Sequence, residues 1–303
     1  MSTNLTALGM LMIMAACSKS NSGSSSAFLV SGKAQLGPIE NATVELHCVE
    51  PNGAIGDELA EAITAADGSY SLSLSARPTC ATMLVLTGGQ YVEEASGVTV
   101  SLGAGTLRSM IGELDEGSQI ATISALTEMA AERFEFLSAA YTSLEPAELE
   151  LLVEKSNEEI RVASGLPAGF DITETLPSDP NEPDSNPDSP QNQYALVLAG
   201  LSELADRLGK NSLEQTALFS TDCTDGDMDI LSWMDLGTRI NEWTVSAENV
   251  GGYTLPSDSI DPVKDPVLSS TDYPTPAPEE PTPTTNPEPA PEPTPEPSPS
   301  SAP

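Results

Sequence analysis

Four aspartates within nine residues form the densest group of possible ligands in this sequence. They are Asp222, Asp225, Asp227 and Asp229, in the stretch TDCTDGDMD. Carboxylate oxygens at alternating positions around a glycine are ligands that Ca²⁺ prefers. The register of a twelve-residue calcium loop fails, however, because its first and third positions would be Thr221 and Cys223. The alternative is that one aspartate caps the helix expected to follow, whose first backbone N–H groups need acceptors.

The sequence contains one histidine, His47. Ser-His-Asp and Cys-His catalysis both need a histidine base, so most nucleophilic mechanisms are excluded unless this residue serves them. Its place beside Glu45 in an alternating strand pattern favours a surface histidine over a metal ligand. Zinc usually draws on several His or Cys side chains and is disfavoured. Paired carboxylates could hydrolyse glycosides, but among 46 acidic residues such pairs arise by number alone.

An apolar run from Leu5 to Ala16 ends at Cys17 and is followed by serine and glycine. A bilayer span needs about 20 apolar residues, so the run has the length of a signal-peptide core instead. Met14-Ala15-Ala16-Cys17 resembles a bacterial lipobox, which implies that Cys17 is lipidated. Residues 1–16 are then a signal peptide and residues 17–26 a flexible tether. The missing basic residues before Cys17 depart from this pattern, and the alternative is a cytoplasmic chain with a chance cysteine.

Three further cysteines are Cys48, Cys80 and Cys223. Export would bring them into an oxidising environment. Cys48 and Cys80 fall in the same predicted domain, so a disulfide between them is expected, with two buried free thiols as the alternative. Cys223 has no partner in this scheme.

The charge balance is 11 basic against 46 acidic residues, a formal net charge of −35. Such a chain repels nucleic acid and anionic membrane surfaces, so nucleic-acid binding is excluded. The negative charge could instead bind divalent cations or basic partners, or keep the protein soluble.

Residues 27–115 alternate with period two and predict short strands. In GSYSLSLS, Tyr70, Leu72 and Leu74 point to one face and the serines to the other. Asp67-Gly68 predicts a hairpin turn, because glycine tolerates positive φ. Several short strands with regular turns predict an antiparallel β-sandwich.

The order of these pieces resembles the carboxypeptidase regulatory-like domain, a transthyretin-like β-sandwich. The matching residues are Gly32, Pro38, Ile39, Ala42, Val44, Leu46, Thr64, Asp67, Gly68 and Tyr70. They are turn and core positions, and Lys33-Ala34 departs from the valine of the family pattern. The resemblance implies a non-enzymatic spacer, adhesive module or stabilising domain.

Residues 116–251 change to helical spacing and predict an all-α bundle of four or five helices. The first helix is expected over 120–144 and the second over 147–163, ending near Gly165. Residues 177–192, rich in Pro and Asp, predict a disordered loop. Helical spacing resumes over 193–209 and again over 229–243. The last stretch places Trp233 and Trp243 on one stripe, which is core or, alternatively, a ligand groove.

Residues 252–303 form an acidic, proline-rich tail that is predicted to be disordered and extended. The fold class expected is therefore multidomain β plus α: an antiparallel sandwich, then a helical bundle, then the tail. This layout resembles uncharacterised lipoproteins of Gram-negative bacteria. Ser18 after Cys17 resembles the pattern that sorts such proteins to the outer membrane.

The function expected is a non-enzymatic surface lipoprotein, anchored through Cys17 and acting as a structural or interaction module in the cell envelope. Its partner would be an envelope or extracellular protein or a glycan. One alternative is a calcium- or glycan-binding surface protein that uses the four aspartates. A second alternative is a carboxylate-dependent hydrolase. No cofactor other than Ca²⁺ is expected.

Overall fold

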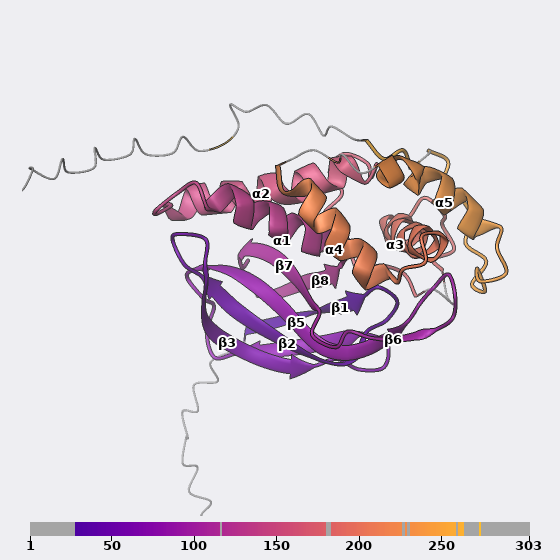
Figure 1. The fold of residues 1–303 in the computed structure, drawn as a ribbon. Helices are drawn as coiled ribbons and strands as arrows, with labels where there is room; N and C mark the ends of the chain where they lie inside the picture. Colours follow the sequence, from indigo (N-terminus) through magenta and orange to yellow (C-terminus); the bar gives the residue numbers. More distant parts are fainter. Residues whose placement is uncertain are drawn as a thin grey trace, which may run out of the picture.

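The computed structural model describes residues 28–115, 117–179, 183–225, 228, 231–258, 260–263 and 273. In this part of the chain eight strands are followed by five α-helices, which confirms the mixed order of β then α (Figure 1). The strands are β1 (Phe28–Gln35), β2 (Glu40–Val49), β3 (Ile55–Ile63), β4 (Ser69–Leu74), β5 (Ala81–Val92), β6 (Thr99–Ser101), β7 (Thr106–Glu113) and β8 (Ser118–Ser124). The helices are α1 (Ala125–Ser138), α2 (Pro146–Ala163), α3 (Pro190–Arg207), α4 (Ser212–Asp222) and α5 (Leu236–Thr244), with 3₁₀ turns η1 (Cys223–Asp225) and η2 (Leu231–Asp235).

The strands lie in two sheets, with the orders β4-β1-β8 and β3-β2-β5-β6, and β7 also pairs with β5. The predicted alternation in β4 is confirmed, since Tyr70, Leu72 and Leu74 are buried while the serines between them are exposed. Gly68 adopts a φ of +76°, as its turn requires. The turn does not close a hairpin, however, because β3 and β4 belong to different sheets.

The sheets are not purely antiparallel, which corrects the sequence-based prediction. β1 pairs with β4 antiparallel but with β8 parallel. β8 contains residues 120–124, the first residues of the segment that the sequence predicts as a helix. The strand forms here because β1 and β8 pack closely at Gly32. A Cβ at this position would lie 1.5 Å from the carbonyl oxygen of Ala121, so only glycine allows the pairing. The boundary predicted after residue 115 therefore falls just ahead of a strand of this sheet.

The change from strand to helix occurs at Ser124. Its hydroxyl accepts hydrogen bonds from the backbone N–H groups of Leu126 and Thr127, which caps α1. The hydroxyl of Tyr194, on α3, lies 2.7 Å from the Ser124 hydroxyl and donates to the carbonyl of Ile172. A buried contact 70 residues away in sequence thus supports the point where α1 begins.

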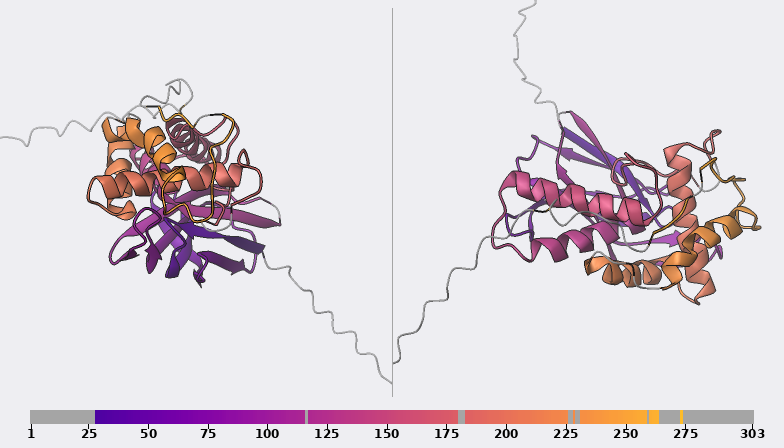
Figure 2. Two further views of the ribbon diagram at one scale, coloured as in Figure 1. Left: turned by 90° about the vertical axis from the view of Figure 1, so that its right-hand side faces the viewer. Right: turned by 90° about the horizontal axis from the view of Figure 1, so that it is seen from above.

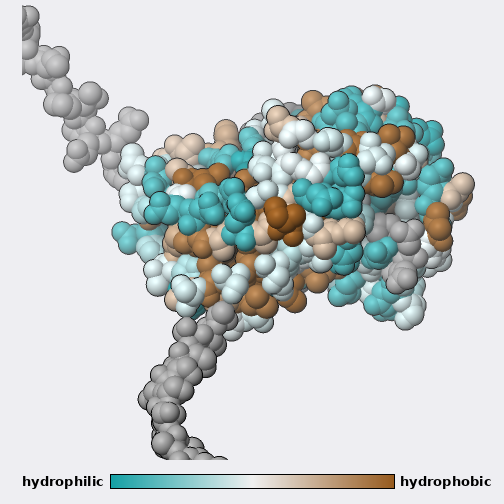
Figure 3. Space-filling model, turned by 90° about the horizontal axis from the view of Figure 1, so that it is seen from below, coloured by the Kyte–Doolittle hydropathy of each residue, from teal (hydrophilic) through white to brown (hydrophobic). Residues whose placement is uncertain are grey.

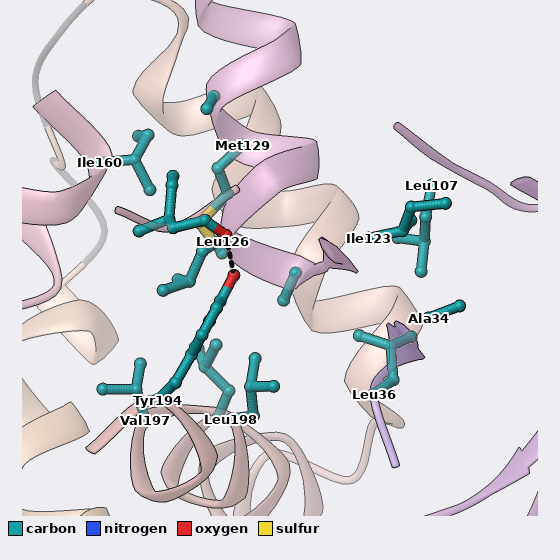
Figure 4. Close-up of a cluster of buried hydrophobic side chains, with 14 of the residues drawn as sticks. Ala34, Leu36, Leu107, Ile123, Leu126, Met129, Ile160, Tyr194, Val197 and Leu198 are labelled. Carbon is teal, nitrogen blue, oxygen red and sulfur yellow. Dashed lines mark hydrogen bonds between the residues drawn. The ribbon is translucent and has the colours of Figure 1, made fainter. Parts of the chain in front are cut away.

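Strands and helices share their core. Figure 4 shows side chains from β7 and β8 (Leu107, Ile123) meeting side chains from α1 and α2 (Leu126, Met129, Ile160) in one buried cluster. The helices lie together on one side of the sheets (Figure 2). The opposite side mixes hydrophilic and hydrophobic side chains (Figure 3). The apolar faces of the helices are therefore buried partly against strands, in a core that both share.

Two segments predicted as disordered are in part packed on this body. The Asn192 amide donates to the carbonyls of Asp184 and Asn186, and α3 begins at Pro190 rather than after 192. Past residue 251, Tyr253 is buried and donates to the carbonyl of Asp179. These hydrogen bonds pair backbone carbonyls within the protein, whereas the composition of both segments predicts that such groups are solvated. Residues 1–27, with Cys17 and the predicted signal peptide and tether, and residues 264–272 and 274–303 of the predicted tail lie outside the described residues.

Candidate functional site

Asp222 and Asp225 do not supply the helix cap that the sequence predicts for one of the four aspartates. Asp222 is the last residue of α4, and Asp225 ends the 3₁₀ turn that follows it. α5 begins after Asp235, which makes no side-chain cap hydrogen bond. Asp227 and Asp229 lie outside the described residues, so a calcium site here stays a prediction. Among the residues that are described, no group of three or more His, Cys, Asp or Glu side chains is arranged to hold a metal ion.

Cys48 and Cys80 form a disulfide with a Cα–Cα distance of 5.7 Å. It ties the end of β2 to the residue just before β5, its antiparallel neighbour. Cys223 is a buried free thiol, and burial raises its pKa to about 12, so it is a poor nucleophile. None of the described helices is long and apolar enough to cross a membrane.

His47 is held within the sheet surface. Its Nε2 lies 3.0 Å from a carboxylate oxygen of Glu45, and its Nδ1 lies 3.2 Å from the carbonyl of Gly56. Both ring nitrogens therefore have local partners. This agrees with the expected surface histidine beside Glu45.

Two arginines form ion pairs that join α1 to its neighbours α2 and β7. The guanidinium of Arg133 on α1 binds both carboxylate oxygens of Glu159 on α2, at 2.5 and 3.3 Å, with both side chains buried. Arg108 on β7 contacts Glu128 and Glu132 of α1. Bidentate pairs of this kind fix the orientation of packed elements, so these arginines are structural.

An acidic groove of about 390 Å³ lies between α2, β7 and the loop 169–174. Its carboxylates are Glu113, Asp115, Glu150, Glu154, Glu158, Asp171 and Glu174. Three of them recur every fourth residue along one face of α2, where like charges repel and destabilise a helix. No lysine or arginine is among the described lining residues.

The charges of the acidic groove are only partly balanced by neighbours. Arg77 lies 3.2 Å from Glu113 and Arg161 lies 2.6 Å from Glu158. Glu150 accepts a hydrogen bond of 2.8 Å from the backbone N–H of Glu113. Burial raises the pKa of Glu150, and the charges of Glu113, Glu154 and Asp115 add to this. The arrangement therefore favours a cationic occupant, and its spread along a groove suits an extended one.

The buried carboxylate of Glu93 connects the sheet to helices α3 and α4. Glu93 follows β5 and accepts four hydrogen bonds, from the Tyr91 and Ser202 hydroxyls and from the hydroxyl and N–H of Ser212. It thereby binds the first turn of α4, where an anion is favoured by the helix dipole. This carboxylate is fully used within the structure.

Sequence reasoning placed none of its candidate residues in the acidic groove. The signal that could have found it is the spacing Glu150, Glu154 and Glu158, which places three acids on one helix face. Trp233 and Trp243, considered as core or as a ligand groove, are both buried, and Trp243 also borders a second cavity.

No protein-family model matches this chain, and no curated protein sequence matches it. Among solved structures, the chain is similar to a 9R-lipoxygenase from Cyanothece PCC8801, with 9% sequence identity and a TM-score of 0.24. The match covers 43% of this chain and 24% of the lipoxygenase. A likeness at this level carries no argument about fold or activity.

Proposed function

We propose that this protein is a non-enzymatic, lipid-anchored surface protein of a Gram-negative cell envelope, and that its acidic groove binds a basic segment of an envelope partner. The anchor in this proposal is Cys17, and it rests on the lipobox-like Met14-Ala15-Ala16-Cys17. The Cys48–Cys80 disulfide supports export, because such bonds persist in oxidising compartments.

The transthyretin-like sandwich is part of the same proposal. Two sheets whose inner faces share buried side chains support it. Two glycines of the family pattern, Gly32 and Gly68, stand where close packing and a positive φ require them. The parallel strand β8 lies outside the residues that carry this resemblance.

The observation that carries the binding proposal is the acidic groove. Seven carboxylates line it without an internal lysine or arginine among the described residues, although repulsion between them opposes folding. Ca²⁺ takes six to eight oxygen ligands, and among the described residues no group of three or more His, Cys, Asp or Glu side chains is arranged to hold a metal ion. Charge spread along a groove instead matches successive Lys or Arg side chains, and the net charge of −35 would speed their approach.

The anchor is tested by Cys17→Ser. The wild-type chain should partition into the detergent phase of a Triton X-114 extraction, and the variant should stay in the aqueous phase. Identical partition of the two proteins would refute lipid anchoring.

The acidic groove is tested with a fluorescent oligoarginine peptide and the variant Glu150→Gln/Glu154→Gln. The control Glu58→Gln/Glu61→Gln removes the same charge from exposed positions on β3. Each partly exposed ion pair contributes up to about 1 kcal/mol, so the groove variant should bind roughly fivefold more weakly or worse, and the control within about twofold of wild type. Equal weakening in both would show that net charge, not the groove, binds the peptide. Displacement of the peptide by millimolar Ca²⁺, but not by Mg²⁺, would favour the calcium alternative.

A further inference from the structure

A second cavity, of about 400 Å³, lies between the turn that joins β5 to β6 and the segment that follows α5. β6 and α5 lie toward the same end of the molecule (Figure 1). The cavity shares no lining residue with the acidic groove. Its apolar wall includes Pro38, Val92 and Val250, and the last two are more than half exposed, so the cavity opens to solvent. This volume is within the range of small-molecule sites.

Glu94 lines this cavity, and its carboxyl has no partner among the described residues. Both of its oxygens expose less than 1 Å² and accept no hydrogen bond from any described residue. Glu93, next to it, has its own oxygens filled by hydroxyl and N–H donors. Burial, with the charges of Glu93 and Asp179, raises the pKa of Glu94 to about 8. A buried carboxyl with neither a hydrogen bond nor a counter-ion is costly, and the cavity beside Glu94 is where a ligand could supply both.

The indole N–H of Trp243 is a second unpartnered group on the same cavity. The other tryptophan offers a comparison, since Nε1 of Trp233 donates to two carbonyls, at 3.2 and 3.3 Å. The Trp243 ring is 2% exposed and packs edge-on against Tyr253, with 5.7 Å between the ring centroids. Because an indole N–H only donates, the group that it lacks is an acceptor.

The surroundings of Glu94 define the charge of the missing group. The titratable groups near it are Glu93 on its own turn, Asp179 from the loop before α3, and Glu248 and Tyr253 from the segment after α5. No lysine, arginine or histidine is among the described lining residues. An anion would be repelled, and the described residues supply no set of three metal ligands here. A protonated amine brings a positive charge and up to three N–H donors.

We propose that this cavity binds a small organic ammonium compound that also carries a hydrogen-bond acceptor. Its cationic nitrogen lies against the Glu94 carboxylate, and its acceptor receives the Trp243 N–H. Its apolar body packs on Pro38, Val92 and Val250. The site is independent of the acidic groove, so either proposal can fail without the other.

The test is isothermal titration calorimetry of the full chain at pH 8 with three probes of one shape: 2-phenylethylamine, 2-phenylethanol and 3-phenylpropionate. The amine should bind at least about thirtyfold more tightly than the alcohol, because a buried charge pair is worth that much, and the acid should not bind. Glu94→Gln should remove this preference. The control Glu58→Gln, which removes the same charge on β3, should keep it. Melting curves of both variants establish that they fold.

Two further readouts separate the site from non-specific attraction. Amine affinity should rise about fiftyfold between pH 6 and pH 8 as the carboxyl loses its proton, and Glu94→Gln should make it independent of pH. 2-Amino-1-phenylethanol should bind more tightly than 2-phenylethylamine to wild type, and equally to Trp243→Phe. Failure of both amines to bind at millimolar concentration, equal affinity for amine and alcohol, or unchanged amine binding in Glu94→Gln would each overturn the proposal.

Discussion

Removal of the Cys48–Cys80 disulfide should destabilise the whole body of the protein. The two cysteines are 32 residues apart, so the bond closes a loop of about 33 residues. The loop-closure expression gives an entropy of about 12 cal/mol/K for that length, which is roughly 3.7 kcal/mol at 25 °C. The melting temperature of a chain this size changes by about 2–4 °C per kcal/mol, so a decrease of roughly 7–15 °C is expected.

The assay compares thermal unfolding, followed by circular dichroism, of wild type and Cys48→Ser/Cys80→Ser. Reduced wild type should melt with the double variant, because both lack the same cross-link. Cys17→Ser leaves Cys223 as the remaining free thiol, and its burial should keep it from reacting with iodoacetamide until the protein unfolds.

The reasoning would be refuted by either of two results. One is that thiols at Cys48 and Cys80 are alkylated in the native, unreduced protein. The other is a double variant that melts within about 2 °C of wild type, which would mean that the loop is already constrained in the unfolded chain.

Three more predictions follow from buried polar groups. Arg133→Met should lower the free energy of unfolding in urea by about 3–5 kcal/mol, because Glu159 is then buried and unpaired. Adding Glu159→Leu should restore most of this stability, and a double variant as unstable as the single one would contradict the explanation. Tyr194→Phe should cost about 1–2 kcal/mol and lower the unfolding midpoints of strand and helix probes together, whereas separate midpoints would indicate two independent domains. Because the folded-state pKa of Glu94 lies above that of an unfolded glutamate, its contribution to stability is lost as the pH rises from about 5 to 8. Melting curves of Glu94→Gln should therefore depend less on pH over that range, and parallel curves for the two proteins would argue against the raised pKa.

Local pattern was sufficient for several elements. The alternation around Tyr70 and the positive φ of Gly68 need only neighbouring residues, and both are found, although the turn does not close the predicted hairpin. α2 likewise runs from Pro146 and ends close to Gly165, whose φ is +74°. These elements are set by side-chain spacing and backbone conformational preference within one segment.

The same spacing misled where a segment satisfies two patterns. Ile120 and Ile123 lie in the segment predicted as a helix, yet they belong to β8. Gly32 has no side chain, and β8 therefore packs closely beside β1 as a parallel strand. Short apolar runs cannot be assigned from period alone, and the partner strand decides between the alternatives. α4 carries few large apolar residues. Its start is capped locally by Asn211 and Glu214, and it is also bound by Glu93, 119 residues earlier in the sequence.

Four features follow from the sequence alone, because each depends on composition or on residues a few positions apart. They are the acidic charge, the lipobox-like segment at Cys17, the alternating strands, and the face of α2 that carries Glu150, Glu154 and Glu158. The tertiary structure alone decides that strands and helices share a core, that the α2 face meets β7 to form the acidic groove, and that Glu94 and Trp243 line one cavity without partners. The physical reason is that burial and the loss of a hydrogen-bond partner are properties of contacts between segments distant in sequence, which periodicity within one segment does not contain.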